Sequence, residues 1–304
     1  MDSFNLQFLY SVVIIGLGYL LRQSNVIKER DGEALGRVVF NITLPSLIIV
    51  TFNGITIDMS LILLIVIAII YGLILACVGL IAFKKEERNT KGMVAMMLPG
   101  FNIGLFAYPL VEGIWGQPGL KYFGMFDVGN AFIVFGLIYL IGSIYSGEKV
   151  RLEGKQLLIK VSKSIPLMTY IIVCTISVIG LQVPRIVLDV SQIISLANMP
   201  LSLLLLGIYL NFSFNREHSK LMAKFISIRY GIGLAFGLFL FYSLPYDEMF
   251  KYTVLIGFIL PVSFSVLPYS VEFKYDQKFV GTLSNITILV SFFLIWVIGN
   301  LILP

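Results

Sequence analysis

The chain has little charge and few hydrophilic stretches. Of its 304 residues only 13% are Asp, Glu, Lys or Arg, whereas 58% are hydrophobic and the mean hydropathy is +0.94. A single soluble core cannot bury that much apolar surface, and the apolar runs repeatedly reach the length that crosses a bilayer. The composition therefore excludes a soluble domain and predicts an all-α polytopic membrane protein.

Residues that hold metals or carry out covalent chemistry are also scarce. The chain has two cysteines and one histidine. Cys77 and Cys174 each lie alone in an apolar run, which excludes a thiolate metal cluster and favours packing. His218 lies in the polar stretch N-R-E-H-S-K, where we expect a surface position. Neither H-E-x-x-H nor G-x-S-x-G occurs, so we expect no enzymatic activity, no cofactor and no metal site.

Ten apolar segments are expected to span the membrane. They lie near residues 4–22, 34–53, 59–83, 92–115, 119–143, 163–181, 187–211, 221–243, 251–272 and 279–302. Nineteen of the 22 Lys and Arg residues fall on one side of this arrangement, and only Lys121, Arg185 and Lys251 fall on the other. Positive residues concentrate in cytoplasmic loops. We therefore expect a multi-pass protein of the cell membrane with both termini on the non-cytoplasmic side.

Five spans in each half make the two halves enter the membrane from opposite faces, which predicts an inverted repeat. The first repeat covers 1–147 and the second covers 163–304, with a short basic cytoplasmic connection at 148–162. The connection is expected to lie along the inner membrane surface, where its basic residues meet anionic lipid. The net charge of +5 needs no nucleic-acid partner.

The fourth and ninth spans each carry two helix breakers seven positions apart, Asn102 and Pro109 in one and Pro261 and Pro268 in the other. Proline removes an N–H and clashes with the preceding turn, and hydrocarbon offers no water to satisfy the freed carbonyls. Corresponding broken segments in two halves predict a substrate site near the bilayer midplane. A carboxylate there could accept N–H bonds from the helix restarts near the second proline of each pair.

A weaker echo between the halves lies in the second and seventh spans. The second carries Asn41 before Pro45, and the seventh carries Asn198 before Pro200. We expect helix breaks at both places. Proline is commoner in membrane helices than in soluble ones, so chance also accounts for one such pair.

Two amides and one carboxyl are candidate site residues at membrane depth. Asp127 lies about 12 Å along the fifth span, where an ionised acid costs about 2.5 to 3.5 kcal/mol. It is a candidate proton carrier, or else a protonated cap on the broken fourth span. Asn130, three residues on, shares its helical face and is expected to line a cavity opposite Asn102. The Asn102 amide could bind a substrate carboxylate through its donor and acceptor groups. The alternative is that it only forms hydrogen bonds with the broken backbone.

Three other charged residues lie in or near the spans. Glu112 and Glu272 follow the breaks closely and are expected to be solvated carboxylates near a membrane face, with gating as the alternative. Arg229 could be a counter-ion to a carboxylate, but we expect its long side chain to snorkel to the cytoplasmic interface.

The stretch FNIGLFAYPLVEGIWGQPGLKYFGMFDVGN, together with ITLPSL around Pro45 and ANMPLSLLLLG around Pro200, resembles the auxin efflux carrier family in its compact, bacterial form. The resemblance implies a ten-helix fold of two five-helix inverted repeats with broken, crossing fourth and ninth helices, as in sodium/proton antiporters and bile-acid transporters. It also implies elevator-type transport, a homodimer, and substrate contact at Asn102. The candidate substrate-binding residues are Asn102, Gly104, Tyr108, Pro109, Asp127, Asn130, Pro261 and Pro268.

The expected function is a secondary carrier of small organic anions, malate permease-like, with Asp127 as the candidate for proton coupling. The chain has no long central loop of the plant auxin carriers, and compact members are generally assigned small organic acids such as dicarboxylates. One alternative is a monovalent cation/proton antiporter, which usually needs two carboxylates at the crossing. Another is a membrane sensor that binds the ligand without moving it.

Overall fold

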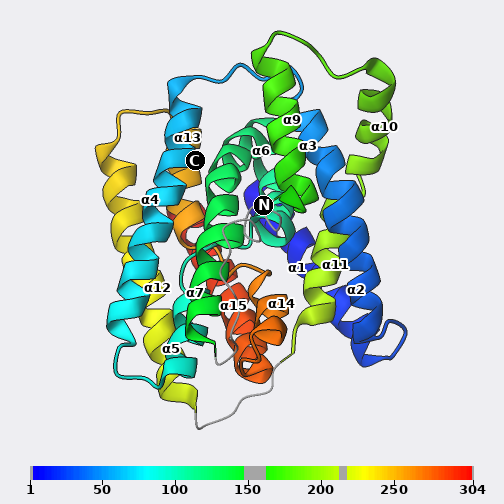
Figure 1. Ribbon diagram of the computed structural model, residues 1–304. Helices are drawn as coiled ribbons and strands as arrows, with labels where there is room; N and C mark the ends of the chain where they lie inside the picture. Colours follow the sequence, from blue (N-terminus) through cyan, green and yellow to red (C-terminus); the bar gives the residue numbers. More distant parts are fainter. Residues whose placement is uncertain (1–2, 147–161, 212–217, 303–304) are drawn as a thin grey trace. The chain divides into compact units, whose positions relative to one another are not determined.

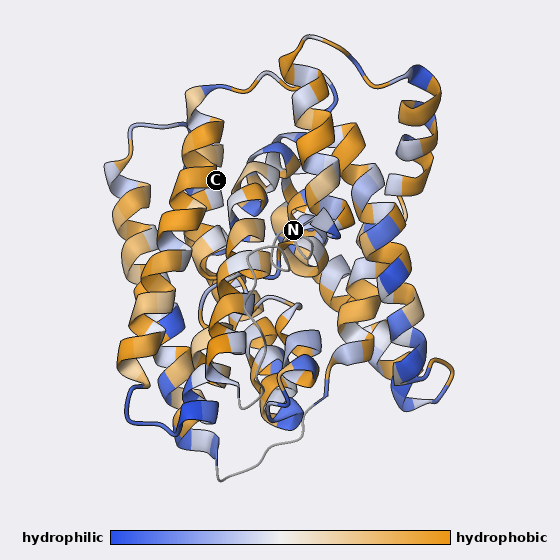
Figure 2. Ribbon diagram, viewed as in Figure 1, coloured by the Kyte–Doolittle hydropathy of each residue, from blue (hydrophilic) through white to orange (hydrophobic). Residues whose placement is uncertain are grey.

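The computed structural model describes residues 3–146, 162–211 and 218–302 (Figure 1). Within these ranges all regular elements are helices, and extended pairing is limited to one isolated bridge. Seven helical segments are long and apolar enough to cross a membrane: Phe4–Gln23, Arg30–Phe52, Met59–Ala82, Ile103–Tyr145, Arg185–Tyr209, Ser219–Ser243 and Gln277–Ile302. Figure 2 colours these helices mostly as hydrophobic residues. The prediction of an all-helical, multi-pass membrane protein is confirmed.

The chain packs into two compact units, each drawing on both halves of the sequence. The first unit comprises 1–62, 103–125 and 162–210, and the second comprises 63–102, 126–161 and 211–304. The repeat boundaries at 147 and 163 therefore remain predictions. The basic connection 148–162 lies outside the described residues except for Ser162.

The first unit is built around α1 and α11, which approach closely at small residues. Its helices are α1 Ser3–Gln23, α2 Glu29–Val38, the π-helix Val39–Thr43, α3 Leu44–Phe52, the π-helix Ile103–Ala107, the first part of α6 Tyr108–Phe132, α9 Ile165–Val178, α10 Arg185–Ser195 and α11 Asn198–Tyr209. A side chain at Gly18 would overlap the Leu204 carbonyl, and one at Gly207 would overlap that of Ile15. Small residues at a membrane-helix interface permit this approach of backbones.

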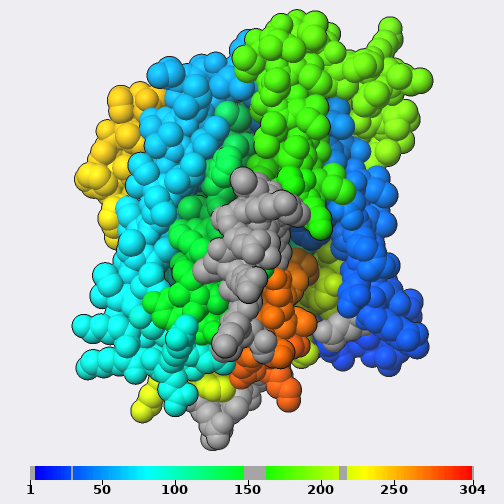
Figure 3. All heavy atoms as spheres, in the orientation of Figure 1, coloured from blue at the N-terminus to red at the C-terminus, as the bar shows by residue number. Residues whose placement is uncertain are grey.

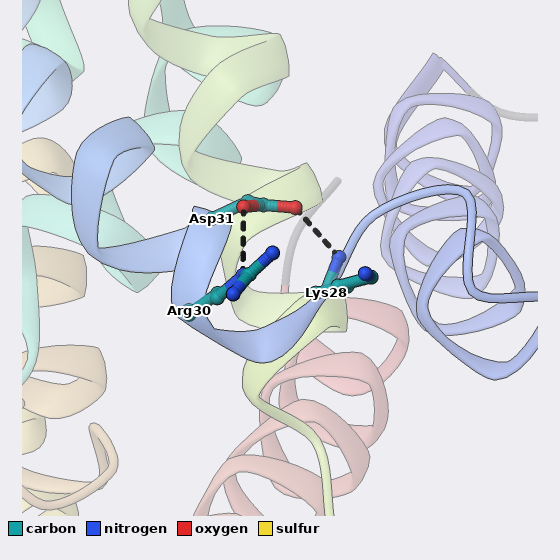
Figure 4. A network of polar contacts seen from close by, with 3 residues as sticks. All are labelled: Lys28, Arg30 and Asp31. Atoms are coloured by element: carbon teal, nitrogen blue, oxygen red, sulfur yellow. Dashed lines mark hydrogen bonds and ion pairs between the residues drawn. The ribbon is translucent and has the colours of Figure 1, made fainter.

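Polar and apolar surfaces of this unit fit a membrane setting. Asp31 accepts a hydrogen bond from the Lys28 N–H at 2.9 Å and so caps α2 (Figure 4). Its exposed 3.9 Å contact with Arg30 contributes little. The side chains of α10 stand out at the surface in Figure 3, with Ile186 75% and Ile193 73% exposed, as lipid contact would require.

The second and seventh spans are irregular where the sequence predicts breaks, but the second is continuous. Asn41 lies in a π-helical turn, and Pro45 is the second residue of α3. In the seventh span a two-residue turn separates α10 from α11, with Asn198 the first and Pro200 the third residue of α11. The two irregular places touch, because Thr43 Oγ1 donates to Asn198 Oδ1 at 3.0 Å.

The second unit holds two interrupted helices. Its elements are α4 Met59–Ala82, α5 Arg88–Met97, the end of α6, the π-helix Ile133–Ile138, α7 Tyr139–Tyr145, α12 Ser219–Ser243, α13 Glu248–Phe258, α14 Val266–Glu272 and α15 Gln277–Ile302. After α5 the backbone is non-helical from Leu98 to Asn102, and after α13 it stays non-helical until Val266. Gly100 has φ +83°, which favours glycine.

Each of these segments is interrupted once, not twice. The second breaks expected at Pro109 and Pro268 are wrong, since these residues are the second of α6 and the third of α14. Proline is tolerated in a first helical turn because the N–H it lacks would have no partner there. The segment Ile103–Tyr145 would be about 65 Å long if straight, twice a bilayer core. It bends at Gly116 (φ 60°, ψ −144°), close to the expected boundary between spans four and five.

Candidate functional site

The two interruptions of the second unit lie against each other. Phe101 and Val262 form an antiparallel bridge, and the Asn102 N–H donates to the Pro261 carbonyl at 3.0 Å. We call this place the junction, defined by residues 98–102 and 259–263. It gives partners to unwound backbone that hydrocarbon could not solvate.

Side chains from two helices complete the hydrogen bonding of the junction. Asn130 of α6 accepts from the Phe101 N–H at 2.9 Å and donates to the Phe101 carbonyl at 3.0 Å. Thr287 of α15 accepts from the Val262 N–H at 3.2 Å. Each paired residue is therefore bound by a polar side chain of a later helix in its own half of the chain. Both polar side chains are buried, Asn130 to 3% and Thr287 to 0% exposure.

The expectation that Arg229 snorkels to the interface is wrong. Its side chain is 0% exposed and donates to three junction carbonyls: to Leu98, to Gly100 at 2.9 Å and to Leu260 at 2.9 Å. Arg229 is the eleventh residue of α12, about 15 Å from its first residue. Carbonyls inside the protein, and not the interface, therefore hold the guanidinium.

Asp127 joins this network through Asn130, whose Nδ2 donates to Asp127 Oδ1 at 3.2 Å. Asp127 is half-buried, and Asn102 is buried to 5% exposure. The sequence-predicted residues Asn102, Asp127, Asn130 and Pro261 thus gather at the junction. Asn130 binds the backbone of Phe101, the residue before Asn102, and a cavity between the two amides remains a prediction.

The other candidate residues have separate places. Gly104, Tyr108 and Pro109 belong to the first unit, where the Tyr108 hydroxyl bonds that of Tyr170. Pro268 is exposed on α14. Whether these residues bind substrate remains a prediction.

The two carboxylates beyond the breaks differ in setting. Glu272 is exposed and accepts a hydrogen bond from the Tyr139 hydroxyl at 2.7 Å, in line with a place near a membrane face. Glu112 is half-buried, and its Oε2 is buried without a hydrogen-bond partner.

Sequence reasoning gave no place at the junction to three residues: Arg229, which it assigned to the interface, Ser263 of the junction itself, and Thr287, which binds it. The glycine spacing in R-Y-G-I-G-L-A-F-G offered a signal for the first, because Gly233 and Gly237 lie one and two turns beyond Arg229. A Cβ on Gly233 would come 2.6 Å from the Phe258 carbonyl oxygen, so α12 and α13 meet there.

The chain matches the family model described as "Membrane transport protein" over residues 6–299. It is 30% identical over 227 residues to an uncharacterized transporter of Methanothermobacter thermautotrophicus, covering 71% of this chain and 70% of that protein. It is 23% identical over 210 residues to an uncharacterized transporter of Methanocaldococcus jannaschii, covering 66% of this chain and 67% of that protein.

Proposed function

The chain belongs to the membrane transport protein family, the auxin efflux carrier family that its sequence resembles, and on that premise we propose that it is a secondary carrier of small carboxylates. The junction is the observation that carries this proposal. Paired helix interruptions at membrane depth form the substrate sites of many secondary carriers. Here a buried amide, Asn102, lies directly beside the paired backbone. An amide can both donate to a carboxylate and accept from a protonated one.

The proposed architecture is two inverted repeats of five helices whose fourth and ninth helices cross at the junction. Its support is the correspondence of roles at the junction. Phe101 pairs with Val262, and the polar side chains that hold them come from Asn130 and Thr287. Ser263 follows Val262 as Asn102 follows Phe101, so it is the second-half counterpart of the amide.

We propose elevator-type alternating access in which the junction moves as part of one rigid body. The support is that the hydrogen bonds that join Asn130, Arg229 and Thr287 to the junction backbone all lie within the second unit. Asp127 is the proposed proton carrier, since its bond to Asn130 links it to the junction backbone. A homodimer is proposed from the family resemblance alone.

The test is flux of radiolabelled mono- and dicarboxylates into proteoliposomes, with and without a pH gradient. Asn102→Ala should abolish saturable flux in a normally folded protein. Asp127→Asn should keep flux but lose its pH dependence. Asn300→Ala, an exposed amide on α15, is the matched control and should transport as the wild type does. No carboxylate flux, with proton-coupled Na⁺ or K⁺ exchange instead, would replace the proposal by a cation/proton antiporter, and binding without flux would indicate a sensor.

The proposed sidedness needs its own experiment. Ser24 and Thr56 are both exposed in loops that the basic residues assign to opposite faces, cytoplasmic for Ser24 and non-cytoplasmic for Thr56. In a chain without Cys77 and Cys174, a membrane-impermeant maleimide should label Thr56→Cys in intact cells and Ser24→Cys only after permeabilisation. The reverse labelling would invert the topology.

A further inference from the structure

A single guanidinium binds the carbonyl ends of both interrupted helices. Leu98 and Gly100 follow α5, and Leu260 follows α13. Arg229 donates to all three, and its guanidinium carbon lies 4.7 Å from the centre of the Phe101 ring. The Arg229 side chain therefore contacts both segments of the junction, 98–102 and 259–263, and the paired residue Phe101.

The charge of this guanidinium is balanced by backbone and not by an acid. Among the described residues no carboxylate forms an ion pair with Arg229. A helix C-terminus carries about half a negative charge, so two of them offset about one positive charge. The side chain has five N–H donors, and Nε is buried without a hydrogen-bond partner. The carbonyls thus hold a fixed, buried cation.

The packing of α12 fixes where this cation lies. Gly233, one turn beyond Arg229, lets α12 approach the carbonyl end of α13. The neighbouring Tyr230 hydroxyl donates to the Thr287 carbonyl at 2.7 Å and lies 2.8 Å from Ser291 Oγ. The contacts of α12 with α13 and α15 therefore fix the position of Arg229. Because the guanidinium is part of the chain, it stays at the junction when a substrate is released.

Unwound backbone carbonyls and half-helix C-termini are the groups that coordinate Na⁺ in many carriers of interrupted-helix architecture. We propose that Arg229 is a protein-borne cation that takes the place of a metal cation at the junction, so that carboxylate transport requires neither Na⁺ nor K⁺. Arg229 is then a positioning residue: it keeps the two helix ends together without itself being carried. The independence of transport from Na⁺ and K⁺ rests on the proposed function. The role of Arg229 in holding the two helix ends together rests on the junction geometry alone.

The transport consequence is tested by ion substitution. Wild-type flux of the best carboxylate should be equal in Na⁺, K⁺ and choline salts at fixed pH. Arg229→Ala should lower flux about tenfold or more, because bonds from a charged donor contribute about 1.5 to 3 kcal/mol each. Millimolar guanidinium should restore part of that flux, whereas equal methylammonium should restore less because it lacks the planar fork. Arg185→Ala, which removes an exposed arginine, is the matched control.

The structural consequence is tested without transport. Purified Arg229→Ala should melt at a lower temperature than wild type, and guanidinium should raise that temperature selectively while leaving wild type and Arg185→Ala unchanged. A folded Arg229→Ala that gains stability from Na⁺ but not from guanidinium would overturn the inference. If Arg229→Ala cannot be isolated, wild type decides: carboxylate flux that needs Na⁺ or K⁺ overturns the inference and keeps the proposed function. If wild type carries no carboxylate, the proposed function fails and the melting experiment alone judges Arg229.

Discussion

Replacing Asn130 by alanine tests whether side chains, and not only the backbone pair, hold the junction together. The amide is 3% exposed and makes two bonds to the backbone of one residue, at 2.9 Å from the Phe101 N–H and at 3.0 Å to the Phe101 carbonyl. Asn130→Ala removes both bonds at a place that is closed to bulk solvent. It also removes the 3.2 Å bond to Asp127.

The expected loss in the free energy of unfolding follows from those bonds. A buried polar group left without a partner costs about 1 to 3 kcal/mol, so two such groups cost about 2 to 6 kcal/mol. Bonds between membrane helices average about 0.6 kcal/mol, because the unfolded chain in the membrane also finds partners. We therefore expect a loss of about 3 kcal/mol. At about 2 to 4 °C per kcal/mol, the apparent melting temperature should fall by about 6 to 12 °C.

The assay is thermal unfolding of detergent-purified protein, followed by tryptophan fluorescence and by the monodisperse fraction after heating. Unfolding of such a protein is expected to be irreversible, so all variants are heated at one rate. Asn300→Ala is the control, because that amide is exposed and donates to the Trp296 carbonyl of its own helix. Equal melting temperatures for Asn130→Ala and Asn300→Ala would refute the reasoning. Asn130→Asp should be intermediate and improve in acid, since a protonated carboxyl regains a donor.

Three further predictions concern helix approach, capping and a loop contact. Gly233→Ala should lower the free energy of unfolding by about 1 to 3 kcal/mol, because its Cβ would come 2.6 Å from a backbone oxygen of α13. The control is Gly231→Ala, whose Cβ would meet open space, and it should be neutral or stabilising in the same thermal unfolding assay. Hydrogen bonds from Ser60 and the Leu61 N–H lower the pKa of Asp58, which caps α4, below its ordinary 3.8. Its contribution should be complete above that value and lost as pH falls through the folded pKa, a dependence that Asp58→Asn should remove from melting curves recorded against pH. Tyr275, whose pKa is raised by burial, donates to a carbonyl of α7 at 2.7 Å, so Tyr275→Phe should cost about 1 kcal/mol in urea unfolding.

The interruptions were predictable because they are local. Pro261 removes an N–H wherever it stands in an apolar segment, and Pro99-Gly100, just before the expected breaker Asn102, removes an N–H and permits a positive φ. The shared face of Asp127 and Asn130 was predictable too, since residues three apart meet on a helix, and their 3.2 Å bond confirms it. The breaks expected at Pro109 and Pro268 were wrong because proline does not interrupt a helix when it lies in the first turn, and the sequence does not show where a helix restarts.

The polar partners of the junction were not predictable because they depend on tertiary approach. Thr287 bonds back to the Ser284 carbonyl of its own helix at 2.7 Å, as threonines in membrane helices commonly do. Its second bond, from the Val262 N–H, exists only because α15 passes the junction. Arg229 is a stronger case. Snorkelling is a property of an isolated helix, and three carbonyls from segments 31 to 131 residues away change the preferred direction of the side chain.

The proposed carboxylate substrate and the proposed proton carrier Asp127 are linked through the charges at the junction. The Arg229 guanidinium taken alone would repel a metal cation about 6 Å away by about 2.8 kcal/mol at an effective dielectric constant of 20, and it would attract a carboxylate by as much. The half-charges of the two helix C-termini reduce this energy, so about a hundredfold in affinity is its upper limit. Asp127, when ionised, adds a negative charge to the network that already holds Asn130, and it opposes the incoming carboxylate. Protonation of Asp127 removes that opposition, so proton and anion should bind together. Carboxylate affinity of wild type should therefore rise in acid, and that of Asp127→Asn should be high at every pH; an equal pH dependence in both proteins would place the coupling proton elsewhere.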